Sequence, residues 1–189
     1  MGNNILLIFG AVALFISSML GLVYIPQMLA DKEVNQVEYV APNIENGHKI
    51  YVREGCVYCH TQQVRPKGFG ADFERGWGEA SLPEDYKGLT PHVLGTMRTG
   101  PDLANIGKRQ PSRDWHYTHL YAPESVSPGS IMPPFPWLFE VVDEDEATSR
   151  KPINLPGEYA KEGKKVIPTE EAEHLVDYLL SLDQEREKE

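Results

Sequence analysis

Basic residues and cysteines are scarce in this sequence of 189 residues. Its 18 Lys and Arg residues are outnumbered by 28 Asp and Glu residues, which gives a formal net charge of −10. This balance argues against binding to nucleic acid or to an anionic lipid surface, and it favours a basic partner or simple solubility. Internal repeats and long strand-like alternation are also missing. We therefore expect a mostly α-helical protein with long loops around one core.

Charge is absent from one continuous stretch near the N-terminus. No charged side chain occurs between Ile5 and Ala30, and the run from Ile5 to Tyr24 would be about 30 Å long as a helix, which matches a bilayer core. A cleaved signal peptide is the alternative, but no Lys or Arg precedes the run. We predict an uncleaved transmembrane anchor over residues 1–30, a polar linker over 31–46 and one domain over 47–189.

Helical patterns are clear only in parts of that domain. A short helix is expected to run into the first cysteine through NIENGHKIYVREGC, and SRDWHYTHLY predicts a helix capped by Ser112. The segment TEEAEHLVDYLLSLDQ predicts an amphipathic C-terminal helix with Thr169 as its N-cap. Between Pro66 and Pro156, Gly and Pro are frequent, so we expect mainly loops with short helical turns, and an acidic insert follows Glu140.

Both cysteines lie in the stretch REGCVYCHTQQVRP, which contains the pattern Cys56-x-x-Cys59-His60. A structural zinc site would need a second cysteine pair or nearby histidines, and His116 and His119 lie too far along the chain for the usual spacing. A redox dithiol would need a preceding strand, which the sequence does not predict. Covalent c-type haem explains every residue of the pattern, because the two thiols attach to vinyl groups and His60 binds the iron.

A second axial ligand is needed if the iron is to serve as an electron carrier. Outside the anchor only Met97 and Met132 are available. Prolines flank Met132 in PGSIMPPFPWL, which favours a rigid loop that presents its side chain to the haem. Met97, in GTMRTGPDL, is more typical of a methionine that fills a gap in the core. A histidine is the other candidate ligand, from a set comprising His48, His92, His116, His119 and His174.

Three longer stretches resemble a known family. They are YVREGCVYCHTQQVRP, RTGPDLANIGKR and DWHYTHLYAPESVSPGSIMPPFPWL, and they occur in family order after an N-terminal anchor. Between about Gly47 and Phe139 the sequence is similar to the membrane-anchored mono-haem cytochrome c subunit (subunit II) of the C-family, cbb-type cytochrome c oxidases. The resemblance implies a class I-like cytochrome c domain in which Cys56 and Cys59 carry one covalent haem c.

The resemblance also implies roles for other residues around that haem. His60 would be the proximal iron ligand and Met132 the distal one. The carbonyl group of Pro101 would accept a hydrogen bond from the free ring N–H of His60. The guanidinium groups of Arg65 and Arg98 are candidates to pair with the haem propionates.

Electron transfer rather than catalysis is the function that the resemblance implies. The chain would be a non-catalytic subunit of a respiratory terminal oxidase and would relay electrons to a multi-span haem–copper catalytic subunit. Its other partners would be a di-haem c subunit and, as a further candidate donor, a soluble cytochrome c. Because c-type haem is attached outside the cytoplasmic membrane, the domain would face the periplasm from a single-pass anchor in the cell (inner) membrane. The cytochrome c subunit of a nitric oxide reductase is an alternative, as is a haem enzyme or gas sensor with an open iron.

Overall fold

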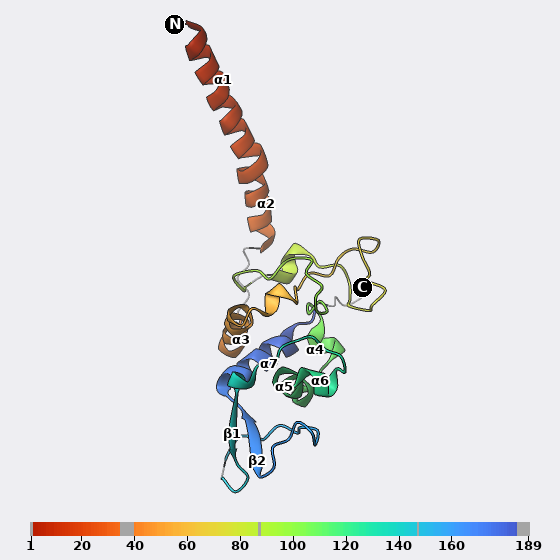
Figure 1. Cartoon of the computed structure of the whole chain (residues 1–189). Coiled ribbons are helices and arrows are strands. Elements are labelled where there is room, and N and C mark those ends of the chain that lie inside the picture. Colours follow the sequence, from red (N-terminus) through yellow and green to blue (C-terminus); the bar gives the residue numbers. More distant parts are fainter. Residues whose placement is uncertain (1, 35–39, 87, 147, 185–189) are drawn as a thin grey trace. The chain divides into compact units, whose positions relative to one another are not determined.

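The computed structural model describes residues 2–34, 40–86, 88–146 and 148–184 (Figure 1). The chain is mostly helical, as the sequence predicts. It divides into two compact units. The first takes in the described residues of 1–39 and 82–88, and the second those of 40–81 and 89–189.

The first unit is built on one continuous apolar helix. α1 (Gly2–Met19) passes through a π-helical turn, η1 (Leu20–Tyr24), into α2 (Ile25–Val34). The part from Asn4 to Leu29 is long and apolar enough to cross a membrane, since it spans about 39 Å at a rise of 1.5 Å per residue. The hydroxyl group of Ser17 donates to a backbone carbonyl of the same helix, which satisfies it without water. The structure thus confirms an apolar helix suited to the predicted anchor.

The predicted linker over residues 31–46 overlaps a helix at each end. α2 continues to Val34 and α3 begins at Pro42, whereas residues 35–39 lie outside the described part of the chain. A short 3₁₀ turn, η3 (Pro83–Tyr86), belongs to the first unit, where it contacts α2. Sequence reasoning did not predict this grouping, because it joins segments that are far apart along the chain.

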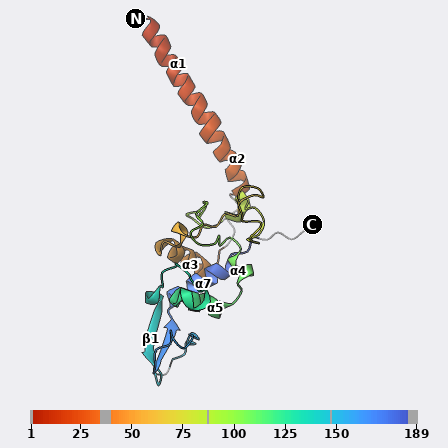
Figure 2. The same cartoon turned by 45° about the vertical axis from the view of Figure 1, so that its right-hand side comes forward.

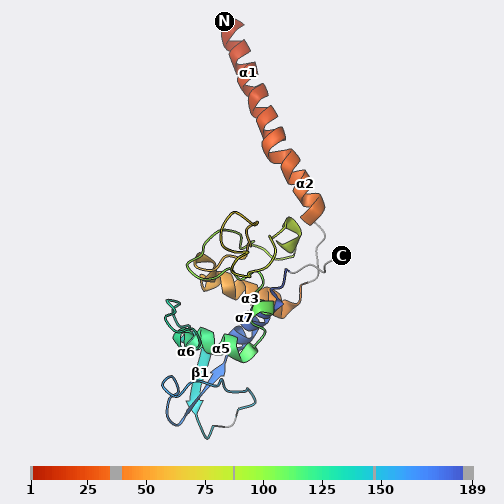
Figure 3. The same cartoon turned by 90° about the vertical axis from the view of Figure 1, so that its right-hand side faces the viewer.

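The core of the second unit forms where α3 (Pro42–Arg53) packs against α7 (Glu170–Ser181), a crossing seen from two further sides in Figure 2 and Figure 3. Gly47 permits the close approach, because a Cβ atom there would lie 2.0 Å from the His174 carbonyl oxygen and 2.5 Å from the Tyr178 Cβ atom. The apolar stripe predicted for the C-terminal helix is the face that α7 buries. Its buried members are Ala172, Leu175, Val176 and Leu179.

Side-chain caps fix the starts of two predicted helices. α5 (Arg113–Tyr121) begins after Ser112, whose hydroxyl oxygen accepts a hydrogen bond from the Trp115 N–H at 3.2 Å. α7 begins after Thr169, whose hydroxyl oxygen accepts one from the Ala172 N–H at 3.3 Å. Both helices are confirmed. The remaining elements of this unit before the strands are single turns: η2 (Cys56–Tyr58), α4 (Ile106–Arg109), α6 (Pro123–Val126) and η4 (Pro136–Leu138).

A β-hairpin, which the sequence did not predict, begins within the segment expected to hold mainly loops and helical turns. β1 (Phe139–Asp143) pairs antiparallel with β2 (Lys164–Pro168), and Figure 1 shows the two strands projecting together beyond α7. An ion pair of 2.5 Å joins Lys164 to Asp143 where the strands face the loop. The hairpin escaped prediction because Val166 and Ile167 are buried side by side instead of alternating with exposed residues.

Candidate functional site

The cysteine motif forms a tight turn at the end of α3. Gly55 follows the helix in the left-handed region, with φ of 75°, and so turns the chain into η2. The His60 N–H then donates to the Cys56 carbonyl oxygen at 2.8 Å. This turn brings Cys56, Cys59 and His60 to one wall of a cavity of about 640 Å³. Neither thiol is in a disulfide.

The imidazole ring of His60 is held by contacts on several sides. Its Nδ1 atom lies 2.7 Å from the Pro101 carbonyl oxygen, and the Gly100 N–H donates to the Cys59 carbonyl oxygen at 3.0 Å. Gly100 has no room for a side chain, because a Cβ atom there would lie 2.1 Å from the His60 Cε1 atom. Tyr51 donates its hydroxyl hydrogen to the His60 carbonyl oxygen. With Nδ1 committed, Nε2 is the ring nitrogen left to bind a metal.

Met132 reaches the same cavity from the loop that follows α6. Its N–H donates to the Ser130 hydroxyl oxygen at 3.2 Å, and the Phe135 N–H donates to the Leu120 carbonyl oxygen at 2.9 Å, which ties the loop to α5. Met97 does not line the cavity, and its side chain is 51% exposed. The interpretation of Met97 as a core methionine was therefore wrong, since that position faces solvent.

The two predicted propionate partners are both engaged elsewhere. Arg65 and Arg98 bind the buried carboxylate of Asp72 at 2.6 Å and 2.8 Å, and Arg98 also lies 3.3 Å from a carboxylate oxygen of Asp102. Burial alone would raise the pKa of Asp72, but the two guanidinium groups hold it well below its usual range. Neither arginine lines the cavity. The structure therefore brings together the predicted cysteines, His60 and Met132, but not these two cations.

Two more polar side chains lie in the cavity wall: Arg109, which sequence reasoning missed, and His119, which it listed only as a candidate iron ligand. The Arg109 Nε atom and the His119 Nδ1 atom are buried and have no hydrogen-bond partner among the described residues. Burial lowers the pKa of His119 to about 4, so its ring is neutral. Arg109 closes the RTGPDLANIGKR stretch, but nothing in the sequence distinguishes it from the neighbouring Lys108.

The electrostatics of the motif argue against a reactive dithiol. Burial raises the pKa of the Cys56 thiol to about 12, whereas redox dithiols depend on a thiolate with a lowered pKa. Among the residues that the structure describes, no three His, Cys, Asp or Glu side chains form a group that could hold a metal ion. The zinc and dithiol interpretations therefore find no support in the geometry.

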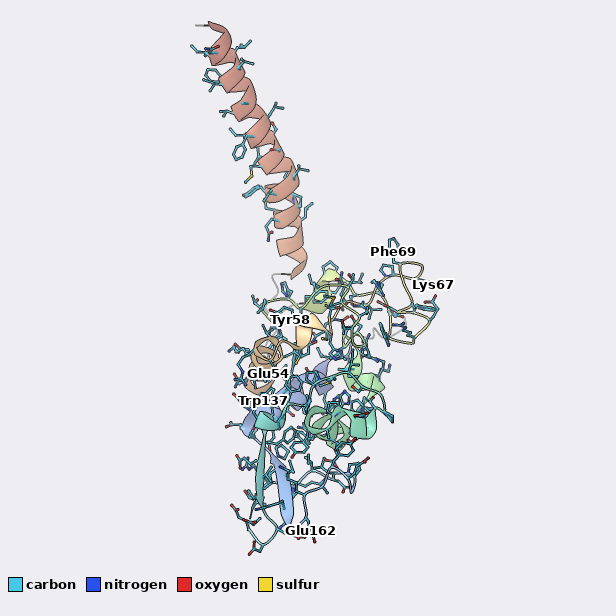
Figure 4. All side chains as sticks on the ribbon, in the orientation of Figure 1. Glu54, Tyr58, Lys67, Phe69, Trp137 and Glu162 are labelled. Carbon is cyan, nitrogen blue, oxygen red and sulfur yellow. The ribbon has the colours of Figure 1, made fainter. Side chains whose placement is uncertain are left out.

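The lining of the cavity fits the chemistry of a c-type haem. Its apolar walls suit a large flat ring, and they come from core residues of several elements, among them Ile106, Leu120, Phe135, Leu175 and Leu179. Two thiols, an imidazole and a thioether supply the attachment points and the axial ligands of such a group. At the rim, Glu54 accepts a hydrogen bond from the Trp137 indole N–H at 2.9 Å, and Tyr58 between the cysteines is 74% exposed (Figure 4).

Comparison with known proteins agrees with this geometry. A family model described as cytochrome c oxidase, mono-haem subunit/FixO, matches residues 2–179, which is nearly the whole chain. A search of curated proteins found no match. The matched region includes the apolar helix, the cysteine motif, the Met132 loop and most of α7. On the strength of this match, the chain belongs to the FixO family, the mono-haem subunits of cytochrome c oxidase.

Proposed function

We propose that this chain carries one covalent haem c on Cys56 and Cys59, with His60 and Met132 as axial ligands. It relays electrons toward the haem–copper catalytic subunit and turns over no substrate of its own. The observation that carries the proposal is that all four side chains line one cavity while the His60 Nδ1 atom is bound to the Pro101 carbonyl. With both axial positions filled by protein, no site remains for a substrate.

The protein residues define the conditions for electron transfer. A bound haem supplies a one-electron couple between Fe(II) and Fe(III). The Pro101 carbonyl fixes the orientation of His60 and makes its ring a stronger donor. The apolar walls keep water away from the axial ligands, and the proline-flanked Met132 loop is tied back to α5. These contacts favour a site that changes little between the two redox states.

We infer the placement and the partners of the chain from its membership of an oxidase family. The apolar helix anchors the chain in the cell (inner) membrane, and we infer that the domain faces the periplasm, where c-type haem is attached. The partners are the catalytic subunit, a di-haem c subunit and a soluble cytochrome c donor. Support comes from the net charge of −10, which suits a basic partner, and from exposed apolar side chains beside the cysteines and Met132, at Tyr58 and Ile131.

The axial ligands are tested by replacing each methionine in the full chain. Met132→Ala should lower the reduction potential and allow carbon monoxide to bind the reduced protein, because the distal position opens. Met97→Ala is the matched control and should change neither property, since its side chain is half exposed and outside the cavity. The opposite pattern would move the ligand to Met97. Carbon monoxide binding by the unmodified chain would favour the open-iron alternative.

The haem content and the complex are tested separately. A pyridine haemochrome assay should find one covalent haem per chain, and none or more than one would overturn the proposal. Purification of the complex should recover a partner subunit that contains copper. A partner with non-haem iron would instead identify a nitric oxide reductase, an alternative that the family match does not favour.

A further inference from the structure

The main chain on either side of the proximal histidine is held by backbone hydrogen bonds. The Gly100 N–H donates to the Cys59 carbonyl oxygen at 3.0 Å, and the Leu103 N–H donates to the Thr61 carbonyl oxygen at 3.1 Å. The carbonyl between these two is that of His60 itself, and no backbone N–H of the described residues donates to it. This carbonyl therefore depends on a side chain for its hydrogen bond.

Tyr51 on α3 supplies that side chain. Its hydroxyl group donates to the His60 carbonyl oxygen, and its ring lines the cavity. The residue is 1% exposed, and burial raises its pKa well above the usual value, so the hydroxyl group keeps its proton. A core position that needed only the ring would suit phenylalanine, which has no hydroxyl group to remove from water. The hydroxyl group is thus explained by its contact with the histidine.

A second tyrosine supports this contact from α7. Tyr178 donates its hydroxyl hydrogen to the Gln62 Oε1 atom at 2.8 Å, and the Gln62 side chain also contacts the Tyr51 hydroxyl group. All three residues are buried. The two tyrosine rings meet edge to face, with their centroids 5.6 Å apart. A buried polar network therefore runs from α7 across α3 to the main chain of His60.

We propose that Tyr51 is a positioning residue for the axial ligand His60. Gln62 and Tyr178 hold the Tyr51 hydroxyl group in place. The proposal rests on the proposed function, because it presumes a haem iron bound to His60. The Pro101 carbonyl fixes one atom of the imidazole ring, and Tyr51 fixes the main chain that carries the ring. Together the two contacts set the plane of the imidazole ring.

The test uses the full haem-loaded chain, purified in detergent, with three variants. Tyr51→Phe removes the hydroxyl group and keeps the ring, and Tyr178→Phe removes the far end of the network. Tyr117→Phe is the matched control, because Tyr117 is a buried tyrosine of the same core that lies outside the cavity wall, and its hydroxyl oxygen accepts from Arg113 at 3.1 Å.

Two nuclear magnetic resonance measurements separate the contact from its effect. The carbonyl ¹³C shift of His60 in the Fe(II) protein reports the hydrogen bond on that carbonyl. The proton shifts of the haem methyl groups in the Fe(III) protein report the plane of the axial imidazole ring. Tyr51→Phe should move the carbonyl resonance upfield and change the spread of the methyl resonances. Tyr178→Phe should change both in the same direction but less, and Tyr117→Phe should change neither.

An unshifted carbonyl resonance in Tyr51→Phe would mean that the hydrogen bond does not exist. A shifted carbonyl with an unchanged methyl pattern would mean that the bond does not orient the ring. An equal change of the methyl pattern in Tyr117→Phe would mean that the effect is general to the core. Each of these results would overturn the proposal. If Tyr51→Phe does not assemble, Tyr178→Phe decides, and unchanged resonances there would overturn it.

These outcomes are separable from failure of the proposed function. A haemochrome assay on the unmodified chain that finds no covalent haem would reject the haem site as a whole. A normal haem content together with an unshifted His60 carbonyl in Tyr51→Phe would reject only the role of Tyr51.

Discussion

Replacing Gly100 with alanine should displace the proximal histidine. The added Cβ atom would lie 2.1 Å from Cε1, 2.5 Å from Nδ1 and 2.6 Å from Nε2 of His60. Ordinary contacts of a Cβ atom begin at about 3.4 Å, so the ring or the Gly100 backbone must move by about 1.3 Å. The His60 Nδ1 atom lies 2.7 Å from the Pro101 carbonyl oxygen. If the ring moves by that amount and the carbonyl does not, this hydrogen bond is lost.

The cost can be estimated from two contributions. Overpacking of a filled site costs about 1–3 kcal/mol, and loss of a hydrogen bond adds about 0.5–1.5 kcal/mol. The free energy of unfolding of Gly100→Ala, measured by guanidinium titration of the haem-loaded chain, should therefore fall by about 2–4 kcal/mol. The absorption spectrum of the ferric protein should change as well, from low spin toward high spin, because a displaced His60 would bind the haem iron less well.

Gly157→Ala is the matched control for this experiment. A Cβ atom at Gly157 would have no atom within 4 Å, so the same substitution there should leave both readouts near those of the parent chain. If Gly100→Ala and Gly157→Ala gave the same unfolding free energy and the same ferric spectrum, the packing of Gly100 against His60 would not hold the proximal ligand in place.

Three further changes test the scaffold around the site. Asp72→Asn should lower the free energy of unfolding by about 1.5–3 kcal/mol at pH 7, because Arg98 then keeps only the Asp102 carboxylate and Arg65 loses its partner. The native pKa of Asp72 is below its unfolded value, so the loss should shrink as the pH falls below about 4, and an equal loss at pH 7 and pH 3 would contradict the ion pair. Gly47→Ala should lower the melting temperature by several degrees, because its Cβ atom would lie 2.5 Å from that of Tyr178, and an unchanged melting temperature would mean that α3 and α7 can separate freely. Thr169→Ala should cost about 1 kcal/mol through loss of the α7 cap, with rescue by Thr169→Ser and no change in the haem spectrum.

Helices that depend on contacts between residues close together in the sequence could be predicted from the sequence. The starts of α5 and α7 were found because Ser112 and Thr169 accept hydrogen bonds from residues three positions ahead. The buried face of α7 was found because its apolar spacing follows the helical period. In each case the residues that decide the structure lie within a few positions of one another, so the pattern is visible in the sequence.

Features that depend on residues far apart in the sequence could not be predicted in this way. β1 and β2 pair across a long loop, and the register from Phe139 with Pro168 to Asp143 with Lys164 depends on a contact that neither strand shows alone. Asp72 is a similar case, because it is one of many acidic residues until the fold places Arg65 and Arg98 on it. The predicted propionate partners were therefore chosen by residue type, and the structure gave them another anion.

The candidate site depends both on a local sequence motif and on contacts between distant residues. The spacing of Cys56, Cys59 and His60 is local, and one turn brings them to the cavity. The Pro101 contact came from the family resemblance, and the structure shows it at 2.7 Å. Arg109 differs, because only the fold shows that its Nε atom is buried without a hydrogen-bond partner among the described residues.

The cavity also links the cofactor to the stability of the domain. Its walls include Tyr51, Ile106, Leu120, Leu175 and Leu179, which are core residues of this unit. The side chains that bind the cofactor and those that hold α3 against α7 are thus partly the same. If the proposed haem is held by Cys56 and Cys59, it would fill this cavity and bind the folded state alone, so loss of the haem should lower the stability of the domain.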